Sequence, residues 1–262
     1  MRKVTFVILV ATVALLSTSC KKDIINLPEQ IIGKWTTAKS QVDPVLTNNK
    51  DVITFFSTTK ASVSVSLDAG QEMGELWLVE KPVDVEIKGN KAILTNRIDD
   101  HTTIVTELEV STIGNGEMIA NRTITKTVDG SVVQSLNQDV RYVQVNVGYG
   151  QAILGTWEGR CTSTGSAFDD GEIHRWEYKA DGSYVYYVKE GDNWIPDESD
   201  ELHQYFVDGD LLFTRWTSYG QEFRENWDIA INGNIMNWSA YRQFNDGTSN
   251  VVTFEMTKVE QP

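Results

Sequence analysis

Aromatic side chains and one histidine in the C-terminal half of the chain are the residues best suited to bind a ligand. His174, Trp176 and Tyr178 alternate with charged residues, so they share one face of an expected β-strand. Aromatic rings with a few polar groups suit stacking on a sugar or lining an apolar pocket. Trp194 lies in a turn-like segment, where a Trp has less reason to be core. The predicted ligand-binding residues are His174, Trp176, Tyr178, Tyr184, Tyr186, Trp194, Trp216 and Trp227.

The same rings could instead fill a protein interior, and the sequence leaves both interpretations open. Trp238 shares a strand face with Met236 and Ala240, so we expect it in the core. Tyr184 and Tyr186 share one face of a strand whose other face is also apolar, so one of these faces must be exposed or line a cavity. Whether the interior is packed or open therefore decides between the two interpretations.

The sequence offers little support for catalysis, and we expect no catalytic residues, metal site or cofactor. His101, His174 and His203 are far apart, and none has a metal ligand at a typical spacing. Cys161 has no recognisable partner for a nucleophilic triad, and the acidic run 197–201 is typical of a solvated connection. A glycan-active enzyme would need two carboxylates at hydrolytic distance, which a sequence cannot establish. The protein is therefore predicted not to be an enzyme.

An internal duplication positions these residues. Ile31–Trp35, with the sequence Ile-Ile-Gly-Lys-Trp, recurs as Ile153–Trp157, with the sequence Ile-Leu-Gly-Thr-Trp. Four further landmarks follow in the same order in both halves, the last at 128–130 and 245–247. Self-similarity of this kind indicates repeated structural units. We therefore predict two β-domains, 31–147 and 152–262, joined near the Gly-Tyr-Gly segment at 148–150.

Each copy reads as a series of short β-strands. Ala61–Leu67 alternates Val with Ser, and turn dipeptides such as Asp208-Gly209 and Asn232-Gly233 separate apolar runs. Sequential hairpins give an antiparallel meander, and curling the meander removes its exposed edges. The predicted fold is all-β, with two tandem antiparallel up-and-down β-barrels or curved meanders.

The two copies differ in composition. Residues 152–262 hold six Trp, seven Tyr and six Phe, whereas residues 20–150 hold two of each. From residue 151 onward there are 20 acidic residues against 8 Lys and Arg, and the whole chain has a net charge of -14. An acidic chain argues against nucleic acid as a partner. A specialised binding surface is therefore expected in the second copy.

The N-terminal segment has the organisation of an export signal. Arg2 and Lys3 precede an apolar run, Val4–Leu16, and small residues at 17–19 lead to Cys20. The segment resembles the signal of bacterial lipoproteins, which implies cleavage of residues 1–19 and acylation of Cys20. Residues 20–30 would then be a lipidated leader that tethers the protein to a membrane of the cell envelope, the outer membrane being favoured and its face left open. An ordinary secretory signal that leaves a free thiol is the alternative.

Both copies also resemble a known group of domains. Ile31–Trp35 and Ile153–Trp157 are similar to the Gly-x-Trp opening of lipocalin-like domains in Gram-negative envelope lipoproteins, and Trp176–Tyr184 is similar to their following strand and hairpin. The resemblance implies that the opening Trp closes one end of each barrel. It also implies that a late cation, Arg141 or Lys258, packs over the indole ring.

Two functional hypotheses follow. The first is a non-catalytic, membrane-anchored lipoprotein whose second domain binds a small hydrophobic or glycan ligand. The alternative is a structural or scaffold lipoprotein of the envelope, with packed barrels, that binds another envelope protein and holds no small molecule. An open cavity in the second domain would favour the first, and a packed core would favour the second.

Replacement of the acylation residue tests the predicted anchor. We expect Cys20→Ser to move the protein from the membrane fraction to the soluble fraction, because acyl chains contribute about 0.8 kcal/mol per buried methylene. The circular dichroism spectrum should not change. Fractionation of cells that produce either protein is the measurement, and a variant that stays with the membrane would contradict lipid anchoring.

Overall fold

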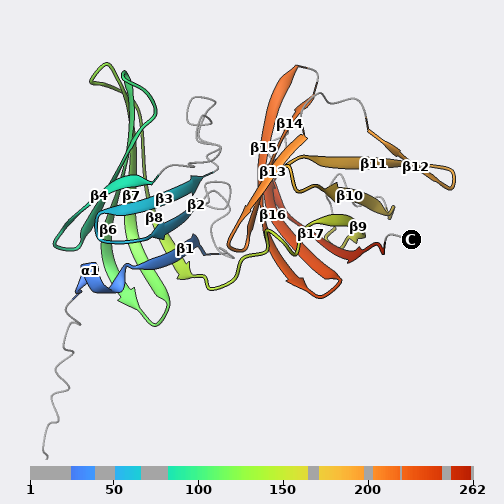
Figure 1. Ribbon diagram of the computed structural model, residues 1–262, viewed down its shortest axis with the longest axis horizontal. Helices are drawn as coiled ribbons and strands as arrows, with labels where there is room; N and C mark the ends of the chain where they lie inside the picture. The colour runs from blue at the N-terminus through green and yellow to red at the C-terminus, as the bar shows by residue number, and fades with distance from the viewer. Residues whose placement is uncertain are drawn as a thin grey trace, which may run out of the picture.

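The structure is a computed structural model, and it confirms an all-β fold of two tandem domains (Figure 1). The predicted signal peptide, 1–19, and the acylation residue, Cys20, lie outside the described residues. Within the described part of the chain, no helix is both long enough and apolar enough to cross a membrane. The structure describes residues 25–38, 51–65, 82–164, 171–197, 203–218, 220–243 and 249–260.

The first domain is a closed antiparallel barrel that follows a single helical turn. Its strands pair in sequence order, and β1 closes the barrel by pairing with both β2 and β8. Its elements are α1 (Leu27–Gln30), β1 (Gly33–Thr37), β2 (Asp51–Phe55), β3 (Lys60–Val65), β4 (Val83–Lys88), β5 (Lys91–Arg97), β6 (Thr102–Gly114), β7 (Glu117–Val128) and β8 (Ser131–Gln144).

The first Gly-x-Trp motif is buried in the core of this barrel. Trp35 is almost fully buried, and its indole N–H donates a hydrogen bond of 2.7 Å to the carbonyl of Ile31. Leu27 of α1, within the segment assigned to the leader, is fully buried in the same core. Gly33 adopts a positive φ of 125°, which a residue with a Cβ rarely adopts. The packed core therefore includes the helical turn that precedes β1.

A buried polar network crosses the interior of the first barrel. Arg122 on β7 lies 2.7 Å from Asp51 on β2, and both side chains are almost completely buried. Strands β8 and β1 separate β7 from β2, so this ion pair spans the barrel rather than joining neighbours. The Tyr142 hydroxyl donates to Asp51 at 3.0 Å, and the Thr37 hydroxyl donates at 2.6 Å. Burial, with the charge of Asp51, raises the pKa of Tyr142 well above its ordinary value.

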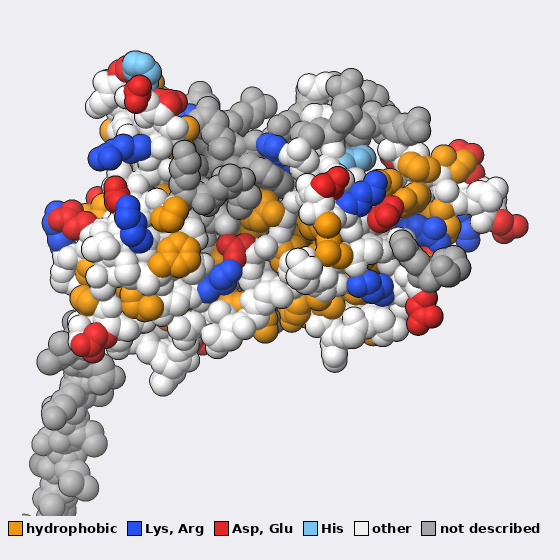
Figure 2. Space-filling model, in the orientation of Figure 1, with side chains coloured by type: hydrophobic (Ala, Val, Ile, Leu, Met, Phe, Trp, Pro, Cys, Tyr) orange, Lys and Arg blue, Asp and Glu red, His pale blue; other side chains and the backbone are white. Residues whose placement is uncertain are grey.

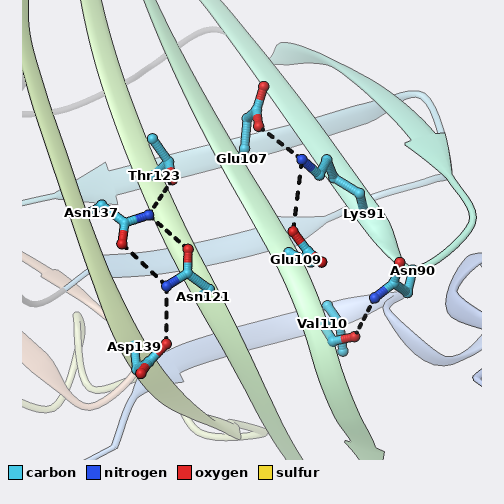
Figure 3. A network of polar contacts seen from close by, with 9 residues as sticks. All are labelled: Asn90, Lys91, Glu107, Glu109, Val110, Asn121, Thr123, Asn137 and Asp139. Carbon is cyan, nitrogen blue, oxygen red and sulfur yellow. Dashed lines mark hydrogen bonds and ion pairs between the residues drawn. The ribbon is translucent and has the colours of Figure 1, made fainter.

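The outer face of the same barrel is polar (Figure 3). Asn121 and Asn137, on the adjacent strands β7 and β8, exchange amide hydrogen bonds, and Asn121 also donates to Asp139 at 3.0 Å. Lys91 on β5 pairs with Glu107 and Glu109 on β6. Apolar side chains therefore point inward and polar side chains point outward, as the alternating sequence predicts.

The second domain is a curled sheet of nine strands in the described residues. The order across the sheet is β12-β11-β10-β9-β17-β16-β15-β14-β13, so β12 and β13 are at its two ends. The strands are β9 (Gly155–Cys161), β10 (His174–Tyr178), β11 (Tyr184–Glu190), β12 (Asn193–Pro196), β13 (His203–Asp208), β14 (Leu211–Ser218), β15 (Gln221–Asn232), β16 (Ile235–Gln243) and β17 (Ser249–Lys258).

The two domains have the same weak point, which we call the seam. In the first domain the seam joins β3 to β4 through two residue pairs, Lys60 with Asp84 and Ala61 with Val83. In the described residues of the second domain, β11 and β13 meet at the corresponding place through the bridge between Ser183 and Gln204, and Tyr205 donates hydrogen bonds to the carbonyls of Gly182 and Lys179. The extra strand β12 extends outward from β11 (Figure 1). The first sheet is therefore a closed barrel, and the second stays partly open at its seam.

The second Gly-x-Trp motif repeats the first. Trp157 is fully buried, and its N–H donates to the carbonyl of Ile153 at 2.6 Å. The Lys258 ammonium lies 5.1 Å from the centre of the Trp157 ring, which confirms the expected late cation in this domain. The prediction was wrong for Arg141, which pairs with Glu117 on the exposed outer face of β7 and β8. Arg141 points outward because its strand parity is opposite to that of the buried Tyr142.

The outer face of β13 and β14 packs against the first domain. Leu211 and Phe213, both fully buried, form an apolar cluster with Val52 of β2. Lys34 of β1 pairs with Asp208, and the Ser64 hydroxyl donates to the same carboxylate at 2.8 Å. Strands β13 and β14 therefore have one face toward the first domain and the other toward the interior of the second.

Removal of the barrel-crossing cation tests the importance of the buried network. We expect Arg122→Ala to lower the free energy of unfolding by about 3–5 kcal/mol, because it leaves a buried carboxylate without its charged partner. The matched control, Lys88→Ala, removes an exposed ion pair with Glu86 and should cost less than about 1 kcal/mol. Urea unfolding followed by circular dichroism measures both, and equal costs would contradict the proposed role of the network.

Candidate functional site

The interior of the second domain contains a cavity of about 180 Å³. An apolar cavity of ~150 Å³ is large enough to hold a benzene molecule, so the space suits one small ring or a group of that size. The lining side chains come from β10, β11 and β13 to β17, almost all the way around the curled sheet. They are Trp176, Tyr178, Tyr184, Tyr186, His203, Thr214, Trp216, Glu225, Trp227, Trp238 and Phe254.

Strand alternation places these side chains inside. Trp176 and Tyr178 are two residues apart on β10, Thr214 and Trp216 are two apart on β14, and the lining residues of the other strands keep the same parity. The residues between them point outward. Thr214 thus faces the cavity, while its neighbour Phe213 packs on the first domain. The period of two in the sequence therefore determines which rings meet at the cavity.

Trp238 is at the centre of the aromatic cluster. Its ring centre lies 4.8 Å from that of Trp176, 5.4 Å from that of Trp227 and 5.7 Å from that of Phe254, with tilted planes. These separations are within the range of favourable aromatic contacts. The Trp238 indole N–H is buried and has no hydrogen-bond partner among the described residues. A buried N–H without a partner costs about 1–3 kcal/mol, so an acceptor on a ligand would relieve that cost.

Three polar side chains interrupt the aromatic lining. His203 on β13 has its ring centre 4.8 Å from that of Tyr184, and Thr214 and Glu225 are directly opposite each other on β14 and β15. Glu225 is the one carboxylate among the lining residues of the described chain, and that lining contains neither Lys nor Arg. The described part of the lining therefore combines ring faces with one acidic side chain.

The inward row of β11 continues beyond the cavity onto an exposed hairpin. Tyr184 and Tyr186 line the cavity, and Val188, next on the same face, pairs with Ile195 of β12. Val188 and Ile195 are 44% and 41% exposed. Figure 2 shows the corresponding group of apolar side chains at the far end of the second domain. An apolar strip thus leads from the hairpin toward the cavity.

Six of the eight predicted ligand-binding residues line the cavity. They are Trp176, Tyr178, Tyr184, Tyr186, Trp216 and Trp227.

The other two predicted residues, His174 and Trp194, lie elsewhere. His174 is buried next to the lining, where its ring stacks on Trp176 at 5.7 Å and its Nδ1 lies 3.0 Å from the Tyr186 hydroxyl oxygen. Trp194 is on the outer face, where the Arg175 guanidinium lies 4.4 Å from its ring centre. From the sequence, a Trp in a short hairpin is expected to be exposed and available for binding. In the structure the Arg175 guanidinium covers the ring of Trp194 instead.

Sequence reasoning missed the other five lining residues, His203, Thr214, Glu225, Trp238 and Phe254. Trp238 was assigned to the core from its parity with Met236 and Ala240. That parity is correct, and all three are buried, but the inward face at Trp238 also borders the cavity. Parity relative to Trp216 and Trp227 would have identified Thr214 and Glu225 as facing the same interior.

The strand registers explain why the second interior is open. Met118 on β7 pairs with Ile113 and Tyr142, and Met236 on β16 pairs in the same way with Ile231 and Met256. Four residues further along each of these strands, the barrel-crossing Arg122 corresponds to Ala240. By the same register, Asp51 corresponds to His174, and Tyr142 corresponds to Met256. The polar network that crosses the first barrel is therefore replaced in the second domain by shorter or uncharged side chains.

Large aromatic rings fill part of the volume that the polar network occupies in the first domain. Through the same registers, Ile53 corresponds to Trp176, and Ala120 corresponds to Trp238. Each of these exchanges adds a ring, whereas the exchange of Arg122 for Ala240 removes a long side chain. The cavity is the volume that remains between the added rings.

The described residues contain no cluster of three or more His, Cys, Asp or Glu side chains that could hold a metal ion. Cys161 is half-buried on β9, and its Sγ lies 3.3 Å from the Ser163 hydroxyl oxygen.

Comparisons with known proteins do not identify this chain. No protein-family model matches it, and no curated protein is similar to it. Among the solved structures that match is a protein of unknown function from the DUF3598 family of Nostoc punctiforme PCC 73102, and the alignment covers 88% of this chain and 97% of that chain. The sequence identity is 10% and the TM-score is 0.28, too low to support an argument. The fold and cavity themselves define the class, which is an all-β protein of two tandem curled antiparallel sheets.

Two buried tyrosines of the second domain, Tyr178 and Tyr205, make its stability sensitive to alkaline pH. Burial, and secondarily the charge of Asp181, raises the pKa of Tyr205 to about 12, and burial raises the pKa of Tyr178 well above its ordinary value. An unfolded tyrosine has a pKa of about 10. Unfolding therefore releases protons above pH 10, so the stabilisation is complete below pH 10 and is lost as the pH rises toward 12.

Urea unfolding at pH 9, 10, 11 and 11.5 measures this effect. We expect the free energy of unfolding to fall across the series, and to fall less steeply in Tyr205→Phe than in the unmodified protein. Parallel curves for the two proteins would contradict a raised pKa at Tyr205.

Proposed function

We propose that this protein is a lipid-anchored envelope protein whose second domain binds a small ligand without transforming it. The observation that carries the proposal is the aromatic cavity of about 180 Å³ in that domain. Ligand sites are typically concave, mostly apolar and equipped with a few polar groups, and this cavity has that character. The lining residues Tyr184 and His203 come from β11 and β13, the two strands that meet at the seam, so we propose the seam as the point where the ligand enters.

The chemistry of the lining supports binding rather than catalysis. Hydrolysis of a glycosidic bond uses two carboxyl groups on opposite sides of the bond, whereas the described lining contains Glu225 as its one carboxylate. Of the nearest histidines, His174 stacks on Trp176 and His203 packs against Tyr184 with tilted ring planes, and Cys161 is not among the described lining residues. A ring-shaped or compact apolar group is the natural occupant of such a site.

In this proposal the first domain acts as a spacer. Trp35, Arg122 and Tyr142 are fully buried within it, and the domain lies between the N-terminal segment and the cavity. Acylation at Cys20 would place the plainer domain near the membrane. The aromatic domain would then extend outward, with the hairpin of β11 and β12 at its far end (Figure 1).

A titration with small compounds tests the proposed binding. The purified full chain is titrated with benzyl alcohol, methyl glucoside, N-acetylglucosamine and choline, and the intrinsic tryptophan fluorescence is recorded. At least one compound should give a saturable change, because the cavity is surrounded by four Trp rings. A flat response to all four by a protein with a cooperative unfolding transition would contradict the proposal.

A pair of tryptophan variants places the binding at the cavity. Trp216 lines the cavity and stacks on Phe223 at 5.5 Å, so Trp216→Ala should weaken binding about tenfold or more. Trp194→Ala is the matched control, because it removes an indole outside the cavity lining and should leave the dissociation constant unchanged. Calorimetric titration compares the two, and equal losses would contradict binding at the cavity.

A further inference from the structure

We infer that the cavity selects a small aromatic compound and holds one six-membered aromatic ring of that compound. The inference rests on the proposed function, since it names the chemical class that the cavity binds. Three observations support it: the share of aromatic residues in the described lining, the angles between their rings, and the size of the space.

Aromatic side chains make up most of the described lining. Eight of its eleven residues are Trp, Tyr or Phe, and they come from six strands, β10, β11 and β14 to β17. An occupant of the cavity therefore contacts rings on several sides. A buried sugar would have most of its hydroxyl groups against these rings, and a hydroxyl that is buried without a hydrogen bond weakens binding. The rings in the lining thus favour an apolar ring over a sugar.

The lining rings meet at steep angles. The ring plane of Trp238 lies at 55° to that of Trp176 and at 55° to that of Trp227. The plane of Phe254 lies at 86° to that of Trp176, and the plane of Tyr178 lies at 68° to that of Trp238. Such rings present both faces, which carry partial negative charge, and edges, which carry partial positive charge. An aromatic guest can meet a face with its edge and an edge with its face, whereas a saturated ring lacks this charge pattern.

The volume of the cavity suits one ring. The space measures about 180 Å³, and an apolar cavity of ~150 Å³ is known to hold a benzene molecule. A benzene ring with one short substituent therefore fits, whereas a large fused ring system such as a haem or a sterol exceeds the space. The size of the cavity thus limits the aromatic ligand to a single ring.

Benzyl alcohol and cyclohexylmethanol compare an aromatic ring with its saturated counterpart. They have the same hydroxymethyl group and the same number of carbon atoms, and the saturated compound has the larger apolar surface. Burial of apolar area alone therefore favours cyclohexylmethanol, whereas contacts between aromatic rings favour benzyl alcohol. Calorimetric titration of the purified full chain should give a dissociation constant about fivefold or more lower for benzyl alcohol. Equal affinity, or tighter binding of cyclohexylmethanol, would overturn the inference and leave the proposed function intact.

A pair of phenylalanine variants gives the second readout. Phe254 lines the cavity and makes an edge-to-face contact with Trp176, with 5.5 Å between the ring centres. Phe254→Leu replaces this ring by an aliphatic side chain and should reduce the preference for benzyl alcohol about threefold. Phe55→Leu is the matched control, because Phe55 is just as deeply buried in the first domain, and it should leave the preference unchanged. An equal effect of the two substitutions on the preference would overturn the role of the lining ring.

The outcomes distinguish the inference from the proposed function. Binding of methyl glucoside, N-acetylglucosamine or choline in preference to benzyl alcohol overturns the aromatic inference alone. No binding of any compound to a protein that unfolds cooperatively overturns both the inference and the proposed function. The comparison of the two alcohols uses the unmodified protein, so it decides the inference even if thermal unfolding shows that a variant has lost its fold.

Discussion

Closure of the curled sheet is the constraint on which the rest of the structure depends. Each domain rolls an antiparallel meander until its third and fourth repeated strands meet at the seam, and each seam is short. Two residue pairs close it in the first domain, and one bridge, Ser183 with Gln204, joins it in the second. In the described residues the second seam has the shorter pairing, and Tyr205 adds hydrogen bonds to the carbonyls of Gly182 and Lys179. The added strand β12 occupies the same side of the sheet.

A closed and a partly open sheet have different interiors. The first barrel is filled by a central ion pair, Arg122 with Asp51, whose remaining acceptors are satisfied by Tyr142 and Thr37. A buried charge pair is retained only when such additional hydrogen bonds accompany it. In the second domain Ala240 occupies the position of the arginine, and aromatic rings replace the smaller side chains nearby. One duplicated framework therefore supports a packed core in one copy and a cavity in the other.

The sequence contained the signals for the repeated framework but not for its interior. The two Gly-x-Trp motifs and the turn dipeptides predicted tandem antiparallel β-domains, and the structure confirms that fold. Six of the ligand-binding residues predicted from the sequence line the cavity, because strand parity directs them to the interior. Parity could not separate a ring that borders a cavity from a ring that is only core, because both point inward, as Trp238 illustrates. The covered position of Trp194 depends on Arg175 of a different strand, and a single strand's pattern carries no information about such a neighbour.

The central claim is that the second domain keeps an accessible cavity where the first domain has a buried ion pair. Crystals of the protein under xenon pressure test this claim directly, since xenon enters empty apolar cavities and scatters strongly. The account predicts a xenon site bordered by Trp176, Trp227 and Trp238. A structure in which these rings close on one another, with no xenon between them, would contradict it.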